Sequence, residues 1–185
     1  NEIGKKAIQA AMMDRPVLMN RAPSLHKFSI MAFQPTLTKG LSIETPGLIT
    51  KPYSLDYDGD TIVLHVPVTE KARKEAFGLL PSKNLYNPRN RSLNYMPDQE
   101  AILGLHLLSS SPEGLKHINS LLPKDITQLS QNATKKNVEN LLAQLAEKHQ
   151  DKYNDITFKL KELGDNHATA QGFSLSLNDL KNNLA

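Results

Sequence analysis

The sequence predicts an α+β protein whose strands come first and whose helices follow. Between residues 17 and 68, short apolar stretches alternate with proline and glycine, which is the pattern of strands joined by turns. From residue 69 onwards, apolar side chains recur at the three- and four-residue spacing of helices. A loop rich in carboxylates, residues 55–61, lies between two of the strand candidates. We therefore expect a small β-barrel with this loop at its mouth, followed by a helical region.

The first part of the chain is expected to contain one helix and several short strands. Residues 4–13 form the helix, because their apolar side chains share one face and Pro16 follows. The clearest strand is residues 62–68, where aliphatic and β-branched side chains predominate. The strand candidates, in chain order, are residues 17–19, 28–33, 37–43, 48–49 and 62–68.

The rest of the chain is expected to be mainly helical. Thr69 is a suitable N-cap for a helix that runs to about Leu79, and the asparagine- and proline-rich residues 84–97 indicate a loop. After a flexible connection over Gly164–Gly172, a strand is expected at residues 173–177. The further helices are expected at residues 98–108, 113–122, 134–149 and 153–163. The predicted domains are residues 1–97, 98–171 and 172–185.

Composition narrows the class of protein. The chain of 185 residues is 39% hydrophobic, which is enough for a core, and it contains no cysteine, which excludes disulfides and thiolate metal sites. No apolar run approaches 18 residues, so a soluble protein is expected. The net charge of +3 allows polyanion binding without requiring it. The six histidines lack metal-ligand spacing and are interpreted as structural.

The carboxylate loop places Asp56, Asp58 and Asp60 at alternate positions. A helix would turn Asp58 away from the other two, and a straight strand would separate alternate residues by roughly 6.5 Å, too far for one Mg²⁺ ion. The backbone must therefore curl, and Gly59 permits this because glycine reaches positive φ without steric cost. Two carboxylates about 4 Å apart then repel by ~4 kcal/mol at an effective dielectric of 20, which a divalent cation would relieve.

The residues of this loop also allow other interpretations. A solvated Asp/Gly turn is the plainest alternative. A helix-loop-helix calcium site is excluded, because Thr61 and Pro67 stand where glycine and glutamate are required. A phosphoaspartate phosphatase is disfavoured, because residues 51–54 make a poor buried strand. A nucleotide-sugar transferase with an Asp-x-Asp motif remains open, since Asp56 and Asp58 would suffice for it.

Arg21 lies in a polar segment broken by proline, between two apolar stretches. Its position predicts a turn that presents the guanidinium to a ligand. The alternative is an arginine that pairs with a carboxylate of its own chain. The sequence alone does not decide between the ligand contact and the ion pair.

Several blocks of this sequence, in order and spacing, carry a family resemblance. They are Arg15–His26, Ala32–Pro35, Asp56–Asp60, His65–Pro67, Pro97–Glu100 with Leu103–Leu105, and Gly172–Asp179. Together they resemble the largest (beta-prime) subunit of multisubunit RNA polymerases. The resemblance covers residues 8–108 well and extends to residues 172–180, whereas residues 109–171 are unmatched.

This resemblance implies a fold and a site. The first 97 residues would form part of a double-psi β-barrel, in which Asp56, Asp58 and Asp60 hold the catalytic Mg²⁺. Arg21 would contact the ribose of the incoming nucleotide or the RNA 3′ end, with Gln99 nearby. Ser54 stands where the family usually has asparagine, which puts one sugar contact in question. The function implied is Mg²⁺-dependent transfer of nucleotides to the RNA 3′ end by a DNA-directed RNA polymerase.

The resemblance also implies partners, because this chain lacks the basic residues needed to hold a triphosphate. We expect other polymerase subunits, among them a second barrel-bearing subunit and the remainder of beta-prime, together with DNA template, RNA product and NTPs, and no membrane. The barrel is expected to be incomplete without them. A cytoplasmic protein is expected, either an excised fragment or a split subunit of a large bacteriophage that acts in the host cytoplasm or virion. The alternatives are the Asp-x-Asp transferase and a non-catalytic module that binds nucleic acid.

Overall fold

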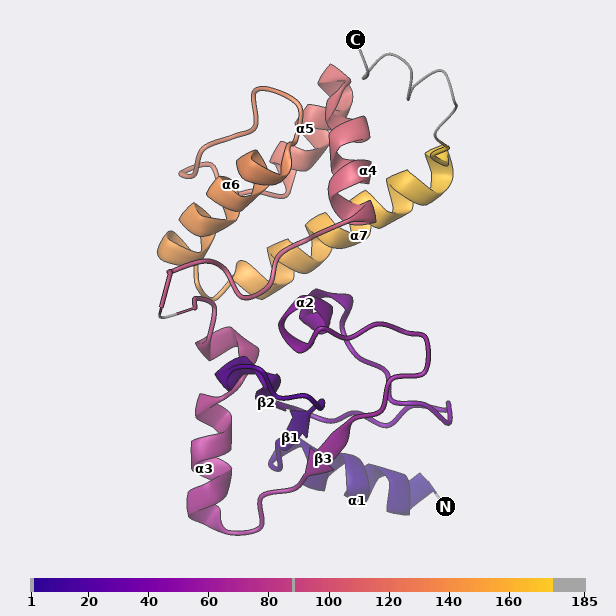
Figure 1. The fold of residues 1–185 in the computed structure, drawn as a ribbon, viewed down its shortest axis with the longest axis vertical. Helices are drawn as coiled ribbons and strands as arrows, with labels where there is room; N and C mark the ends of the chain where they lie inside the picture. Colours follow the sequence, from indigo (N-terminus) through magenta and orange to yellow (C-terminus); the bar gives the residue numbers. More distant parts are fainter. Residues whose placement is uncertain (1, 88, 175–185) are drawn as a thin grey trace. The chain divides into compact units, whose positions relative to one another are not determined.

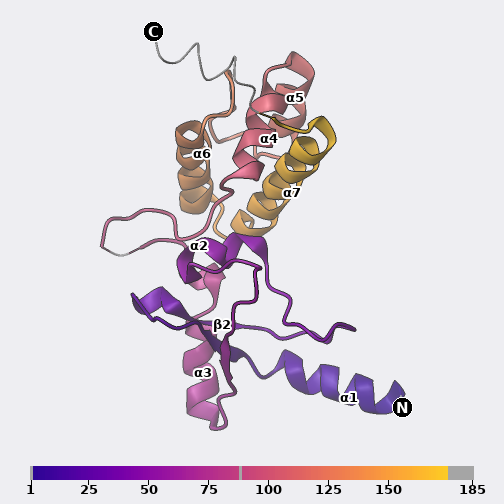
Figure 2. The ribbon, with the colours of Figure 1, turned by 45° about the vertical axis from the view of Figure 1, so that its right-hand side comes forward.

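The computed structural model describes residues 2–87 and 89–174, and the chain divides after Tyr95 into two compact units. Both units are visible in Figures 1 and 2. The first unit mixes helices with a small sheet, and the second contains helices, so the α+β class predicted from the sequence is confirmed. In the first unit the elements are α1 (Glu2–Met13), β1 (Val17–Asn20), the 3₁₀ helix η1 (Lys27–Ser29), β2 (Ile30–Phe33), η2 (Gly47–Ile49), α2 (Thr50–Tyr53), β3 (Val63–His65), α3 (Glu70–Gly78) and η3 (Pro81–Lys83).

The sheet of the first unit has the strand order β2-β1-β3, with both pairs antiparallel. Met19 in the central strand lies opposite Met31 of β2 and Leu64 of β3. The strand predicted for residues 62–68 is present only as the three residues of β3. Pro67 has no N–H to donate to a neighbouring strand, which accounts for the end of β3 at His65.

Two other strand predictions are wrong. Residues 37–43 adopt no regular structure, and residues 48–49 lie in η2, which leads directly into α2. A strand needs a neighbour to satisfy its backbone groups, and residues 37–43 pair with no strand among the described residues. Their apolar side chains Leu37, Leu41 and Ile43 are exposed. The described strands therefore form an open sheet, and the closed barrel expected from the sequence is not seen.

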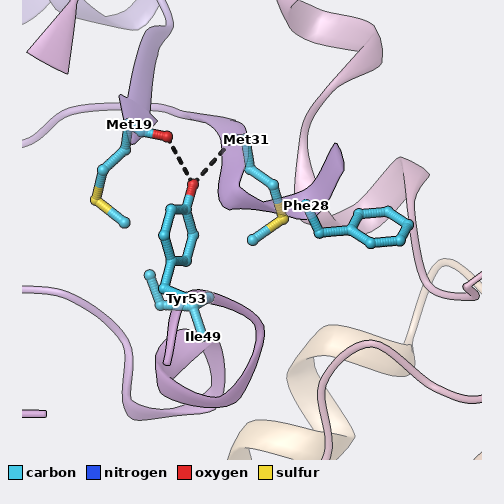
Figure 3. Close-up of a cluster of buried hydrophobic side chains, with 5 residues drawn as sticks. All are labelled: Met19, Phe28, Met31, Ile49 and Tyr53. Atoms are coloured by element: carbon cyan, nitrogen blue, oxygen red, sulfur yellow. Dashed lines mark hydrogen bonds between the residues drawn. The ribbon is translucent and has the colours of Figure 1, made fainter. Parts of the chain in front are cut away.

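The core of the first unit gathers five buried side chains from the sheet and the short helices: Met19, Phe28, Met31, Ile49 and Tyr53. Figure 3 shows how the Tyr53 hydroxyl bridges the two strands: it donates to the Met19 carbonyl (2.8 Å) and accepts from the Met31 N–H (2.9 Å). Burial of this hydroxyl raises the pKa of Tyr53 to about 12. The tyrosine thus fastens the end of α2 to β1 and β2.

The second unit contains α4 (Glu100–Ser109), α5 (Pro112–Ser120), α6 (Lys135–Lys148) and α7 (Tyr153–Gln171). The apolar face predicted for α6 is confirmed, because Val138, Leu141, Leu142 and Leu145 are all buried. The N-cap predicted at Thr69 in the first unit is confirmed as well, since its hydroxyl accepts from the Ala72 N–H. None of the described helices has both the length and the apolar composition that crossing a bilayer requires.

Helices α4 and α7 lie side by side (Figures 1 and 2). Their backbones approach each other closely at glycines. A Cβ atom built on Gly104 would lie 1.8 Å from the Gly164 carbonyl oxygen, and one built on Gly164 would lie 2.2 Å from that of Ala101. The prediction of a flexible connection over Gly164–Gly172 is therefore wrong, since Gly164 lies inside α7. A glycine is needed at this position because the neighbouring helix leaves no room for a side chain. The strand predicted for residues 173–177 lies mostly outside the described residues.

Candidate metal centre

The carboxylate loop follows α2 directly. Ser54 caps the end of the helix: its N–H bonds to the carbonyls of Lys51 and Thr50, and its backbone is left-handed (φ 48°, ψ 41°). The Leu55 N–H bonds to the Thr50 carbonyl (2.8 Å), and the Leu55 side chain packs against the core. The chain therefore enters the loop from a fixed point on the core of the first unit.

Within the loop, the carboxylates of Asp56, Asp58 and Asp60 come together. Each offers an oxygen, and these three oxygens lie within 4.8 Å of one another. Gly59 has φ +119°, the positive value that the predicted curl requires. The Asp56 N–H also donates to Oδ2 of Asp60 (3.1 Å), which closes the turn.

Arg21, the residue after β1, reaches the same loop. Its Nε lies 2.8 Å from Oδ2 of Asp60, and its Nη2 donates to Oδ1 at 2.9 Å. Its Nη1 lies 3.5 Å from the Tyr53 carbonyl oxygen. The pairing of Arg21 with a carboxylate of its own chain, one of the two possibilities left open by the sequence, is therefore present. The sugar contact stays a prediction.

The three carboxylates differ in their electrostatic surroundings. The hydrogen bond from Arg21, followed by that from the Asp56 N–H, lowers the pKa of Asp60 below its usual range. The pKa of Asp56 is instead raised, first by the hydrogen bond that its protonated form makes to Asp58, then by burial and by the neighbouring negative charges. Arginine therefore compensates one side of the cluster, and the Asp56–Asp58 side keeps excess negative charge.

The cluster fits a hard divalent cation. Carboxylate oxygens are the ligands that Mg²⁺ prefers, and octahedral bonds of about 2.1 Å place neighbouring oxygens about 3.0 Å apart and opposite ones about 4.2 Å apart. The three carboxylate oxygens lie within 4.8 Å of one another, close to this spacing. Asp56 and Asp58 are exposed, so their side chains can rotate to adjust the spacing to an ion.

The remaining predicted site residues lie in different places. Ser54 is exposed and immediately precedes the loop, whereas Gln99 belongs to the second unit, where it precedes α4. An open cavity of about 770 Å³ adjoins the loop and is also lined by residues 42–45. No sequence motif points to Glu44 and Thr45, because they line this cavity only through the path of the irregular segment before η2.

The comparisons with known proteins agree on one family. The family model of RNA polymerase Rpb1, domain 2, matches residues 2–81, which include the sheet, Arg21 and the carboxylate loop. The DNA-directed RNA polymerase subunit beta′ of Treponema pallidum is 39% identical over 113 residues, 59% of this chain and 8% of that subunit. The beta′ subunit of a Hydrogenobaculum species is 28% identical over 221 residues, 95% of this chain and 14% of the relative. That of Thermotoga petrophila is 29% identical over 219 residues, 89% of this chain and 13% of the relative.

Two of these alignments cover 95% and 89% of the chain and therefore extend into the region of residues 109–171, which the sequence blocks left unmatched. The chain nevertheless spans only a small part of each relative, from 8% to 14% of its length. These matches identify the chain as a relative of the largest (beta-prime) subunit of multisubunit DNA-directed RNA polymerases, corresponding to a small part of that subunit.

Proposed function

We propose that this chain forms part of the catalytic centre of a DNA-directed RNA polymerase, in which Asp56, Asp58 and Asp60 hold Mg²⁺ during nucleotide addition to the RNA 3′ end. The observation that carries the proposal is the convergence of three carboxylates on one loop, inside the segment that matches Rpb1 domain 2. A solvated turn would have no need to draw three like charges together.

The residues of this chain would divide the work. When bound, magnesium supplies positive charge that favours the attacking oxygen and the transferring phosphoryl group. Asp56 and Asp58 carry the excess negative charge that attracts a cation. Arg21 orients Asp60 and, because a guanidinium has five N–H donors, keeps others available for a sugar hydroxyl.

The sheet supports the proposal of a barrel completed by other strands. Apolar side chains of β3 and the residues after it are exposed, namely Val63, Leu64, Val66 and Val68. Exposed apolar strand residues are typical of surfaces that another chain or segment covers. We therefore propose a double-psi β-barrel shared with other parts of the polymerase, which would also bind DNA template, RNA and NTPs. The positive charge of Arg21 is already matched by Asp60, so cations for the triphosphate would come from those parts.

The proposal is tested by Asp58→Asn in the assembled polymerase, with elongation of a primed RNA scaffold as the readout. A neutral amide in the middle of the cluster is expected to reduce nucleotide addition by more than about a hundredfold, since even outer partners of a metal site cost 10–100-fold. Asp151→Asn, at an exposed aspartate of the second unit, is the control and should leave the rate unchanged.

Near-normal elongation by Asp58→Asn would refute the proposal. The Asp-x-Asp transferase hypothesis makes a different prediction, because it requires Asp56 and Asp58 but tolerates Asp60→Asn. Loss of elongation in Asp60→Asn therefore separates the two functions.

A further inference from the structure

The two oxygens of Asp60 are used unequally. Oδ2 accepts two hydrogen bonds, from Nε of Arg21 (2.8 Å) and from the Asp56 N–H (3.1 Å). Among the described residues Oδ1 accepts one, from Nη2 of Arg21 (2.9 Å). Each carboxylate oxygen has two lone-pair sites, so Oδ2 is filled and Oδ1 keeps one site open.

We infer that Arg21 is a positioning residue that presents Asp60 to a divalent cation through Oδ1 alone. The inference rests on the proposed function, because it takes Asp60 to be a metal ligand. It adds a role for Arg21 that is separate from any contact with substrate: the arginine decides which oxygen of Asp60 faces the ion and keeps it in one orientation.

The surroundings of Arg21 suit this role. Its side chain and that of Asp60 are only 21% and 16% exposed, so the pair is held more firmly than a surface ion pair. Its third nitrogen, Nη1, faces the carbonyl of Tyr53, whose hydroxyl is locked between β1 and β2 (Figure 3). Arg21 itself follows β1 directly. Asp60 is thus tied to the sheet from two directions, whereas Asp56 and Asp58 are exposed.

The contribution of Arg21 must be geometric, because its charge acts in the opposite direction. A guanidinium beside a bound cation repels it, so charge alone would make Arg21 weaken cation binding. A benefit therefore depends on the two-pronged contact that only a planar guanidinium makes with a carboxylate. Lysine at this position keeps the charge and loses the second contact, which separates the two effects.

The experiment measures Mn²⁺ binding by electron paramagnetic resonance in the assembled polymerase without nucleotide. The site is defined as the Mn²⁺ that wild type binds and Asp58→Asn does not. Arg21→Lys is expected to weaken this binding about tenfold, the effect typical of losing an outer partner of a metal ligand. Arg21→Gln, which also loses the two-pronged contact, is expected to weaken it as well. Arg73→Lys is the matched control, because Arg73 pairs with Asp14 (3.0 Å) elsewhere in the same unit, and its Mn²⁺ affinity should equal that of wild type.

Each result has a defined meaning. Arg21→Lys within twofold of wild type, or tighter binding by Arg21→Gln, would overturn the positioning role while leaving the metal site intact. If wild type and Asp58→Asn bind the same Mn²⁺, the proposed function fails and the role of Arg21 fails with it. The Asp58→Asn comparison therefore distinguishes the two failures.

Discussion

Substituting Gly104 by alanine tests the close contact between α4 and α7. The new Cβ would lie 1.8 Å from the Gly164 carbonyl oxygen, 2.6 Å from its carbonyl carbon and 3.0 Å from the Ala168 nitrogen. Carbon and oxygen approach no closer than about 3.3 Å even in weak hydrogen bonds, so the helices must separate by roughly 1.5 Å at this point. All three atoms belong to helix backbone, so no side chain can rotate out of the way.

The size of the effect follows from two opposing contributions. Overpacking usually costs about 1–3 kcal/mol and occasionally more. A gap wider than about 0.5–1 Å loses at least a quarter to a half of the dispersion attraction across it, so the cost here should lie at or above the upper end of the overpacking range. Alanine returns up to about 1 kcal/mol through its higher helix propensity. We expect a net loss of about 3 kcal/mol in the free energy of unfolding of the second unit, equivalent to roughly 12–24 °C for a unit of this size.

The assay is thermal unfolding followed by circular dichroism, with amide exchange of α4 and α7 as the local report. Gly4→Ala and Gly78→Ala are the controls, because a Cβ at either position meets nothing within 4 Å. They should be neutral or stabilising by up to about 1 kcal/mol. An unfolding temperature for Gly104→Ala close to those of the controls would refute the reasoning.

Two further predictions concern single side chains. Tyr53→Phe leaves a buried donor and a buried acceptor without their partner, so the first unit should lose about 2–4 kcal/mol and the Met31 amide should exchange faster. Unchanged protection of that amide, relative to Tyr57→Phe at an exposed tyrosine, would contradict this. The hydrogen bond with His149 lowers the pKa of Asp125 in the folded protein. An acid whose pKa falls on folding adds stability, which is fully present above its unfolded pKa of about 3.9. This stability is lost as the pH falls through the lowered pKa of the folded state. Urea midpoints of wild type and His149→Gln should therefore converge below about pH 4, and a constant difference between them would count against the pair.

The sequence predicted those parts of the fold that are decided by near neighbours in the chain. The Thr69 cap satisfies a backbone N–H three residues away, and the apolar face of α6 depends on a repeat within 14 residues. The curl at Gly59 has the same local origin. Such features need no knowledge of the rest of the molecule.

The errors concern contacts between distant residues. Residues 37–43 have the composition of a strand, but their structure depends on a partner that composition does not specify. Gly164 suggested a break in the helix, whereas its role is set by α4, some 60 residues earlier. The partner of Arg21 was ambiguous for the same reason, because Asp60 lies 39 residues away.

The unequal restraint of the three aspartates has an entropic consequence. Asp60 is already ordered by Arg21, while Asp56 and Asp58 are exposed and would lose rotamer freedom when they close on a cation. Part of the free energy of cation binding is then spent on ordering those two side chains. Anything that restricts them beforehand would raise cation affinity without touching the ion, because the ordering cost would already have been met.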